Sequence, residues 1–319
     1  MNLVDFQKTL HEYYSYRDVC RMKDSPRKNM DRFFSFSCRR HPGERNLTQA
    51  MIDEWWVKRV SENAGSYCIR VCQVLPYLRY VTSRYPDAGY TIPQTPKWEK
   101  SKYTPHCYTE QELSAFFHAC DHMGRPNSSL ECRLNEIEFP VLFRLLFSTG
   151  MRTTEVRMLA TKNVDLHKGV IYISKDATKG YTERKVVLHE SMLNLLVLYD
   201  KSVGTMLPGR KIFFPNNEDG IHDSGWLSTH FRRLWKKAGN SDGVIAYDLR
   251  HHFIIENINS WTDDGIDLHS KMVALSKYVG HTKLSSTYSY YSLVPRLGDI
   301  IEQVSMEELD DLILDIPCT

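Results

Sequence analysis

The 319-residue chain contains no apolar run of the roughly 18 residues that a membrane span requires. Even the strongly apolar stretch Val141–Phe147 includes Arg144. Residues 1–10 carry two charges and lack the apolar segment of a secretory signal. We therefore expect a protein that works in the cytoplasm and has no membrane partner.

The eight cysteines form no regular pattern and include no C-x-x-C pair. Cys68 and Cys72 lie one helical turn apart, but no histidine pair accompanies them, so free buried thiols are favoured over a zinc site. The sequence also lacks a clear Asp/Glu cluster of the kind that binds metal ions. We expect no metal and no cofactor.

Internal repeats and low-complexity tracts are also missing, and the hydrophobic (42%) and charged (25%) fractions are those of a globular protein. The length predicts two domains. Charge is unevenly distributed: residues 1–106 contain 18 Lys and Arg against 11 Asp and Glu, whereas residues 297–319 contain seven acids and no base. A basic N-terminal part is typical of a protein with a polyanionic partner.

Residues 1–86 predict a helical domain. Apolar residues recur at helical spacing from residue 3, and Ser25-Pro26, Thr48 and residue 64 mark three further helix starts. Pro76 predicts a kink or restart in the fourth helix. Four of the thirteen prolines then fall between residues 86 and 105, which predicts a linker over residues 87–106.

The second domain, over residues 107–296, is predicted to be mainly α with a small antiparallel β-sheet (α+β). A capping box, Thr109-x-x-Glu112, opens it, and an apolar helix over 139–149 ends at Gly150, after which Thr153 caps the next helix. Two runs rich in β-branched residues, joined by a polar connection, predict the strands of the sheet over 170–174 and 184–188. Further helices are predicted over 191–199, 228–238, 248–260 and 270–278.

Five short motifs in this domain carry reactive side chains: Gly150-Met151-Arg152, Lys179-Gly180, Tyr247-x-x-Arg250, Gly280-His281 and the tyrosines 288, 290 and 291. Each alone has an ordinary explanation. An arginine at a helix start often forms a surface ion pair, a hairpin lysine is often solvated, and clustered tyrosines often pack in a core.

In this order, however, the motifs resemble the tyrosine recombinase (phage integrase) family over Thr109 to about Ser292, and the helical first domain resembles that family's core-binding domain. The resemblance implies that Tyr290 attacks a DNA phosphate, that Arg152, Arg250 and His281 stabilise the transition state, and that Lys179 protonates the leaving 5′-oxygen. Tyr290 is favoured over Tyr288 and Tyr291 by its spacing from His281. Glu155 either orients Arg152 or is a surface carboxylate.

Tyr247 departs from the family pattern, because the resemblance places a histidine there as a general base or as a group that orients the nucleophile. A phenol with an ordinary pKa near ~10 is a poor proton acceptor at neutral pH. His251 and His252 are close in sequence, but we expect both to point elsewhere on their helix.

The resemblance implies a metal-independent, site-specific DNA recombinase that acts through a 3′-phosphotyrosyl intermediate and a Holliday junction. Its expected partners are two DNA sites, three further copies of the chain and accessory DNA-bending proteins, with the acidic tail 297–319 docking on a neighbouring subunit or in cis. A type IB topoisomerase and a DNA-binding regulator with a decayed active site are the alternatives. Candidate phosphate contacts in the first domain are Arg27, Lys28, Arg39, Arg40, Lys58, Arg59 and Arg70.

Overall fold

The computed structural model describes residues 4–22, 27–97, 103–124, 127–175, 183–261 and 267–290. The chain divides into two compact units, Met1–Tyr103 and Thr104–Thr319. Helices dominate both units, and a three-stranded antiparallel sheet lies in the second. The predicted fold class, mainly α with a small antiparallel sheet, is therefore confirmed. Within the described residues, no helix is both long enough and apolar enough to cross a membrane.

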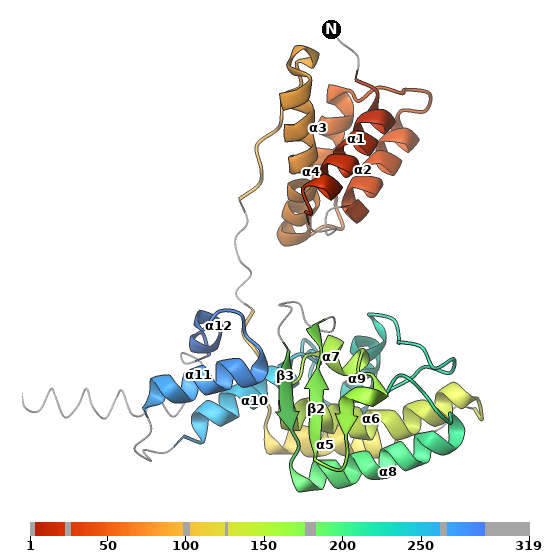
Figure 1. Ribbon diagram of the computed structural model, residues 1–319, viewed down its shortest axis with the longest axis vertical. Coiled ribbons are helices and arrows are strands. Elements are labelled where there is room, and N and C mark those ends of the chain that lie inside the picture. The colour runs from red at the N-terminus through yellow and green to blue at the C-terminus, as the bar shows by residue number, and fades with distance from the viewer. Residues whose placement is uncertain are drawn as a thin grey trace, which may run out of the picture. The chain divides into compact units, whose positions relative to one another are not determined.

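The N-terminal unit is a bundle of four helices (Figure 1): α1 (Phe6–Val19), α2 (Arg27–Arg40), α3 (Gln49–Trp56) and α4 (Ala64–Arg84). Its core is aromatic, with the ring of Phe6 5.3 Å from that of Phe33 and 5.9 Å from that of Tyr77. Thr48 caps α3 as predicted, since its hydroxyl accepts the amide of Met51 at 3.3 Å. Pro76 lies inside a continuous α4, so the predicted helix restart is wrong.

The segment after α4 packs on this bundle. A 3₁₀ turn, η1 (Pro86–Ala88), follows the helix, and Ala88 is buried. Further along, the Tyr90 hydroxyl donates to the carbonyl of Leu47 at 2.6 Å, and the Trp56 indole donates to the carbonyl of Gln94 at 3.3 Å. The linker predicted to begin at residue 87 therefore starts later than expected, because these residues belong to the N-terminal unit.

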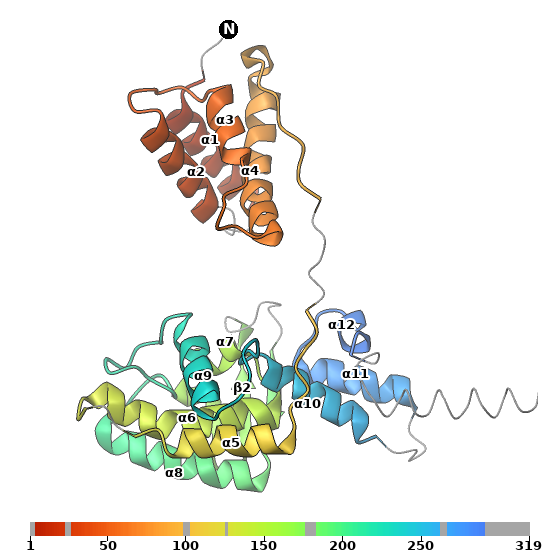
Figure 2. The ribbon, with the colours of Figure 1, turned by 180° about the vertical axis from the view of Figure 1, so that it is seen from behind.

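The core of the second unit is built on four helices (Figure 2): α5 (Glu110–Asp121), α6 (Leu130–Thr149), α8 (Glu190–Met206) and α9 (Trp226–Lys237). The fully buried rings of Phe116, Phe139 and Phe143 lie at their centre. The predicted capping box is present, because the Thr109 hydroxyl accepts the amide of Glu112 and a Glu112 carboxylate oxygen accepts the amide of Thr109. Helix α6 ends at Gly150, also as predicted.

The sheet consists of β1 (Val164–Asp165), β2 (Val170–Ile173) and β3 (Arg184–Val187), in that order and antiparallel throughout. Its buried side faces the helical core, since Ile171, Ile173 and Val186 are almost inaccessible to solvent. Strands β2 and β3 were predicted. Strand β1, preceded by the short η2 (Thr161–Asn163), was not predicted because two residues are too few to show an alternating pattern.

Four further helices complete the unit (Figure 1): α7 (Thr153–Arg157), α10 (Asp248–Asn259), α11 (Leu268–Val279) and α12 (Ser285–Tyr288). A small core of Ile254, Ile258, Met272 and Val279 holds α10 and α11 together, and Tyr290 packs on it. Helix α10 also packs against α6, and α11 against β3. Side chains from distant parts of the sequence are thereby brought to one place.

The cysteines only partly follow the prediction of buried thiols. Cys68 and Cys120 are buried, whereas Cys20, Cys38 and Cys107 are exposed. The Sγ atoms of Cys68 and Cys72 lie 3.6 Å apart on α4, which is far longer than a disulfide bond.

Candidate active site

Two glycine turns allow the arginines of the motifs to approach each other. Gly150 ends α6 with φ +61°, and a Cβ atom there would clash with the ring of Phe253. Gly280 ends α11 with φ +71°, and its Cβ would lie 3.0 Å from Nη1 of Arg184 and 3.3 Å from Nη1 of Arg152. Both positions therefore require glycine, for the left-handed conformation and for space.

Arg152 follows the first turn and is held by its own helix. It is the N-cap of α7, so the helix begins at Thr153, and the prediction of Thr153 as the cap is wrong. The Arg152 amide donates to Oε2 of Glu155 at 2.8 Å, and its Nη1 donates to Oε1 at 2.7 Å. Nη2 donates to the carbonyl of Gly280, which links α7 to the second turn. The guanidinium is consequently fixed while part of it stays accessible.

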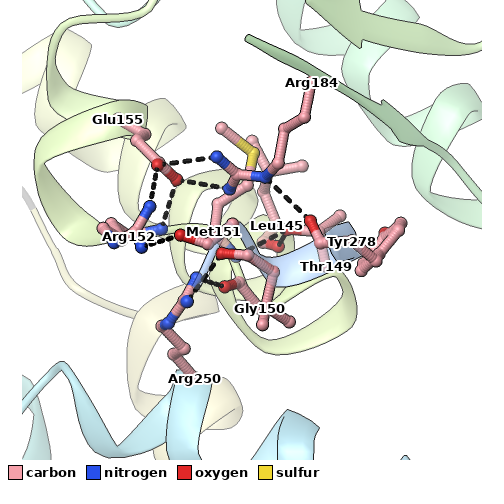
Figure 3. Close-up of polar contacts among 11 residues, drawn as sticks. Leu145, Thr149, Gly150, Met151, Arg152, Glu155, Arg184, Arg250 and Tyr278 are labelled. Atoms are coloured by element: carbon pink, nitrogen blue, oxygen red, sulfur yellow. Dashed lines mark hydrogen bonds and ion pairs between the residues drawn. The ribbon is translucent and has the colours of Figure 1, made fainter. Parts of the chain in front are cut away.

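Glu155 holds a second arginine as well (Figure 3). Nη1 and Nη2 of Arg184 donate to the two carboxylate oxygens of Glu155 at 2.8 and 2.7 Å, and Nε donates to the carbonyl of Tyr278 at 2.8 Å. Burial raises the pKa of the fully buried Glu155, but Arg184 and Arg152 outweigh this effect and leave the pKa below its ordinary value. Glu155 is therefore an ionised partner that orients Arg152, and not a surface carboxylate.

Arg184 was not predicted as a site residue, although the sequence contains a signal for it. Side chains two apart on a strand share a face, and Arg184 precedes the buried Val186 by two positions in β3. An arginine on the buried face of a strand needs a charged partner. That requirement points to a buried carboxylate such as Glu155.

Arg250 lies on α10 and is almost completely buried. Its Nη1 donates to the carbonyl of Gly150 at 2.5 Å and its Nη2 to the carbonyl of Val279 at 2.7 Å (Figure 3). Its Nε has no hydrogen-bond partner among the residues that the structure describes. Burial lowers the pKa of Arg250 to about 10, so the side chain remains a cation at neutral pH. Because that Nε is itself buried, what Arg250 contributes to the site is its positive charge.

Tyr290 is buried beside these groups. Its hydroxyl oxygen lies 2.6 Å from Nδ1 of His251, and its ring is parallel to that of His281 with 6.2 Å between ring centroids. Burial raises the pKa of Tyr290 to about 12, a shift that the positive charges of Arg250 and Arg152 oppose. The phenol is therefore protonated at neutral pH and must lose its proton before it can attack.

Tyr288 has different surroundings. It is partly exposed, and its hydroxyl lies 2.8 Å from Nδ1 of His269 on the surface of α11. Tyr291 lies outside the described residues. Of the two tyrosines that the structure describes, Tyr290 is the one placed next to buried arginine and histidine side chains, which agrees with its selection as the candidate nucleophile.

His281 follows the Gly280 turn, and its Nδ1 lies 2.8 Å from the hydroxyl of the buried Thr287. Burial, followed by the charges of Arg250 and Arg152, lowers the pKa of His281 to about 4. Its imidazole is therefore neutral at pH 7. When the Thr287 hydroxyl donates to Nδ1, Nε2 carries the remaining proton and can donate it to a phosphate oxygen.

His251 corrects one prediction. We expected both His251 and His252 to point away from the site, and this is wrong for His251, which contacts Tyr290. The expectation is right for His252, whose ring stacks on Phe147 at 5.3 Å. The reason is helical geometry: His251 lies four residues after Tyr247 and so shares its face of α10, where the two rings meet edge to face at 4.9 Å.

Lys179 lies outside the described residues, in the connection between β2 and β3, so its role stays a prediction. The structure describes the other predicted catalytic residues. Arg152 and Tyr247 are the N-cap residues of α7 and α10, and Arg250 lies on α10. His281 follows α11, and Tyr290 follows α12.

The N-terminal unit contains a groove of about 620 Å³ between α2 and α4, and four arginines lie on its wall: Arg32, Arg39, Arg59 and Arg70. Arg39 and Arg59 were predicted phosphate contacts, and both are exposed. Lys28, Arg40 and Lys58 are exposed as well, whereas Arg27 pairs with Asp18. Arg59 also lies over the ring of Trp55 at 5.2 Å, which orients its side chain.

Arg70 does not suit the role of a phosphate contact. Only 8% of the residue is exposed, and its Nε and Nη2 donate to the two carboxylate oxygens of Glu62 at 2.8 and 2.9 Å. Nη1 and Nη2 also donate to the carbonyls of Trp55 and Val57. These contacts tie the start of α4 to the end of α3, so Arg70 is a structural residue of the bundle and does not fit the phosphate contact predicted for it.

Comparison with known proteins decides the family. Residues 107–295 match the model of the phage integrase family. The chain belongs to the phage integrase family. This membership confirms the resemblance inferred from the order of the motifs.

Two family relatives and one solved structure illustrate the similarity. The chain is 29% identical over 193 residues to a putative integrase/recombinase, y4rE, of Sinorhizobium fredii, and 26% identical over 186 residues to the tyrosine recombinase XerC of Lactobacillus delbrueckii subsp. bulgaricus. These matches cover 59% and 57% of this chain and 59% of each relative. A lambda integrase tetramer bound to a Holliday junction shares the fold with a TM-score of 0.57 at 16% identity, over 88% of this chain and 78% of that chain.

Proposed function

We propose that this member of the phage integrase family is a site-specific DNA recombinase that cuts and rejoins strands through a covalent bond between Tyr290 and a 3′-phosphate. The observation that carries the proposal is the buried Tyr290 hydroxyl, 2.6 Å from His251 and within the positive field of Arg250 and Arg152. A phenol in such surroundings is suited to attack a phosphodiester, because the resulting phosphotyrosyl ester preserves the bond energy for rejoining.

The arginines stabilise the charge that builds up on the phosphate. Arg152 and Arg250 are each fixed by carbonyl or carboxylate acceptors before any DNA binds, so little reorganisation is needed in the transition state. His281, neutral at pH 7, adds a hydrogen bond to an oxygen of the same phosphate.

The leaving 5′-oxygen needs a proton, and Lys179 is the proposed donor. In the sequence it lies between β2 and β3, five residues before Arg184. Arg184 is held at the site by its ion pair with Glu155. Two guanidinium groups supply the positive charge of the reaction, so these steps use no metal ion.

The recombination proposal includes partners. Two DNA sites would be held by four copies of the chain, as in the lambda integrase tetramer bound to a Holliday junction. The groove of Arg32, Arg39 and Arg59 would contact DNA phosphates, the tail 297–319 would dock on a neighbouring subunit, and accessory proteins would bend the DNA. The reaction would integrate or excise a mobile element or resolve joined DNA in the cytoplasm.

The test uses nicked duplexes that carry the sequences flanking the gene. The protein is incubated with them without metal, quenched in SDS and examined for a covalent protein–DNA band. We expect a band for the wild type, none for Tyr290→Phe, and an undiminished band for Tyr288→Phe, which loses the exposed phenol beside His269. Specific, salt-sensitive DNA binding without any band would refute the recombinase and support a regulator with an inactive site.

A further inference from the structure

Tyr290 cannot attack as a phenol, and the family's usual proton acceptor is replaced in this chain by Tyr247. The Tyr247 phenol is half-buried and makes no hydrogen bond within the part of the chain that the structure describes. The candidate nucleophile, Tyr290, must therefore lose a proton, but the position where the family usually has a histidine to accept it holds the phenol of Tyr247.

We propose that His251 acts as the proton acceptor instead, so that its Nδ1 accepts the proton of Tyr290 during attack and returns it when the strand is rejoined. This inference rests on the proposed function. The 2.6 Å separation of Nδ1 and Oη is a short hydrogen bond, within the range that a general base requires. The bond joins α10 to the segment after α12, so His251 also positions the nucleophile.

The Tyr290 oxygen forms a bond to phosphorus as its proton moves to His251 Nδ1, and the bond from phosphorus to the 5′-oxygen breaks as that oxygen takes a proton from Lys179. In the reverse step a 5′-hydroxyl attacks the phosphotyrosine and gives its proton back to Lys179, while Tyr290 leaves and regains its proton from His251. His251 must start as a neutral imidazole with hydrogen on Nε2, so that Nδ1 carries a lone pair.

The surroundings of His251 favour the neutral form. Burial lowers the pKa of His251, the charge of Asp248 opposes this, and that of Arg250 reinforces it. His281 faces it from the end of α11 and Tyr290 from beyond α12. Tyr247 packs its ring edge to face against His251, at 4.9 Å, and so limits the orientation of the imidazole. Tyr247 thus occupies the position of the family's usual histidine and holds the imidazole of His251, the proposed base, in place.

The decisive experiment is the pH dependence of single-turnover cleavage, measured with excess protein on the nicked duplex between pH 6 and 9. With a working base, the wild-type rate is level well above pH 6.5, the ordinary imidazole value, because burial lowers the pKa of His251 and leaves the side chain deprotonated there. His251→Asn keeps an acceptor oxygen at the place of Nδ1 but cannot take a proton. We expect it to cleave about 10²-fold more slowly at pH 7 and its rate to rise about tenfold per pH unit, following the tyrosinate fraction.

His269→Asn is the matched control, since the same substitution there changes an exposed histidine that contacts Tyr288 across 2.8 Å. It should leave the rate and the level profile unchanged. Melting temperature and DNA affinity, measured for every variant, separate loss of folding from loss of chemistry.

The outcomes distinguish this inference from the proposed function. If the wild type forms no Tyr290-dependent complex, the recombinase itself is refuted. If the wild type cleaves but its own rate rises tenfold per pH unit, no base acts and the assignment of His251 is overturned, even without a variant. A His251→Asn protein with the wild-type rate and level profile overturns it as well.

Discussion

Arg184 and Glu155, 29 positions apart in the sequence, form a buried two-pronged ion pair with N–O distances of 2.8 and 2.7 Å. The same carboxylate holds Arg152 at 2.7 Å. Strand β3 and helix α7 are therefore joined through one negative charge that serves two cations. Because Arg152 is a proposed phosphate ligand, this carboxylate links the stability of the unit to the geometry of the reaction.

Glu155→Gln should destabilise the second unit by about 3 kcal/mol at pH 7, because a buried arginine is left without its counter-charge. The folded pKa of Glu155 lies below its ordinary value of 4.5, so its contribution is present above pH 4.5 and is lost as the pH falls through the folded value. The difference between wild type and variant should consequently shrink below pH 4.5.

Calorimetry of the second unit's transition at pH 7 and pH 3.5 measures this effect. Glu218→Gln, an exposed carboxylate in a turn, is the control and should change the transition little at either pH. A Glu155→Gln transition equal to that of the wild type at pH 7 would contradict the account of this ion pair.

The arginines of the N-terminal unit should separate into two classes. Arg39→Ala and Arg59→Ala should weaken DNA binding and reduce the slope of log affinity against log salt by roughly 0.9 for each lost phosphate contact, without unfolding the bundle. Arg70→Ala should instead destabilise the bundle by about 1–3 kcal/mol, because the carbonyls of Trp55 and Val57 and the partly buried Glu62 lose their donor. Fluorescence anisotropy titrations and melting curves test both. A stable Arg70→Ala protein with a reduced salt slope would contradict the assignment.

Tyr247→His should maintain or raise the rate of cleavage, because it places an imidazole at the family's usual position. In a His251→Ala background the same change should restore cleavage by at least tenfold, which single-turnover assays can measure. Tyr247→Phe keeps the ring against His251 and should cleave at nearly the wild-type rate. A severe loss in Tyr247→His or Tyr247→Phe would show that the phenol itself has a specific role.

Lys179→Ala should slow cleavage of an ordinary duplex by about 10²-fold or more, since the alkoxide then leaves without a proton. A duplex with sulfur in place of the 5′-bridging oxygen should be cleaved at similar rates by wild type and variant, because a thiolate, with a conjugate-acid pKa near ~8.5, needs no proton. The His251→Asn defect should persist on that substrate. Equal slowing of Lys179→Ala on both substrates would rule out Lys179 as the proton donor.

Much of the fold could be predicted because its signals are local. Periodic apolar residues, the capping box at Thr109 and the glycine after α6 lie within single elements, and each was found where expected. Strand β1 and helix α12 were missed because two and four residues are too short to show a period. The start of the linker was misplaced because the contacts of Tyr90 and Gln94 with the bundle join residues about 40 positions apart.

The candidate site was only partly accessible from the sequence for a related reason. Order and spacing pointed to Arg152, Arg250, His281 and Tyr290 as candidates, but not to how their side chains are held. The pairing of Arg184 with Glu155 and of His251 with Tyr290 depends on which elements meet in space. For His251, four-residue spacing from Tyr247 was available as a clue. The spacing alone does not show that Tyr290, which follows α12, lies against this face of α10.

The most direct test of the central claim is to locate the DNA adduct in the covalent complex. After nuclease digestion of the DNA and tryptic digestion of the protein, tandem mass spectrometry of the peptide from Leu284 to Arg296 distinguishes Tyr288, Tyr290 and Tyr291. We predict a 3′-phosphonucleotide on Tyr290 alone. An adduct on Tyr288 or Tyr291, or on a residue outside this peptide, would contradict the proposed nucleophile and the role of His251 with it.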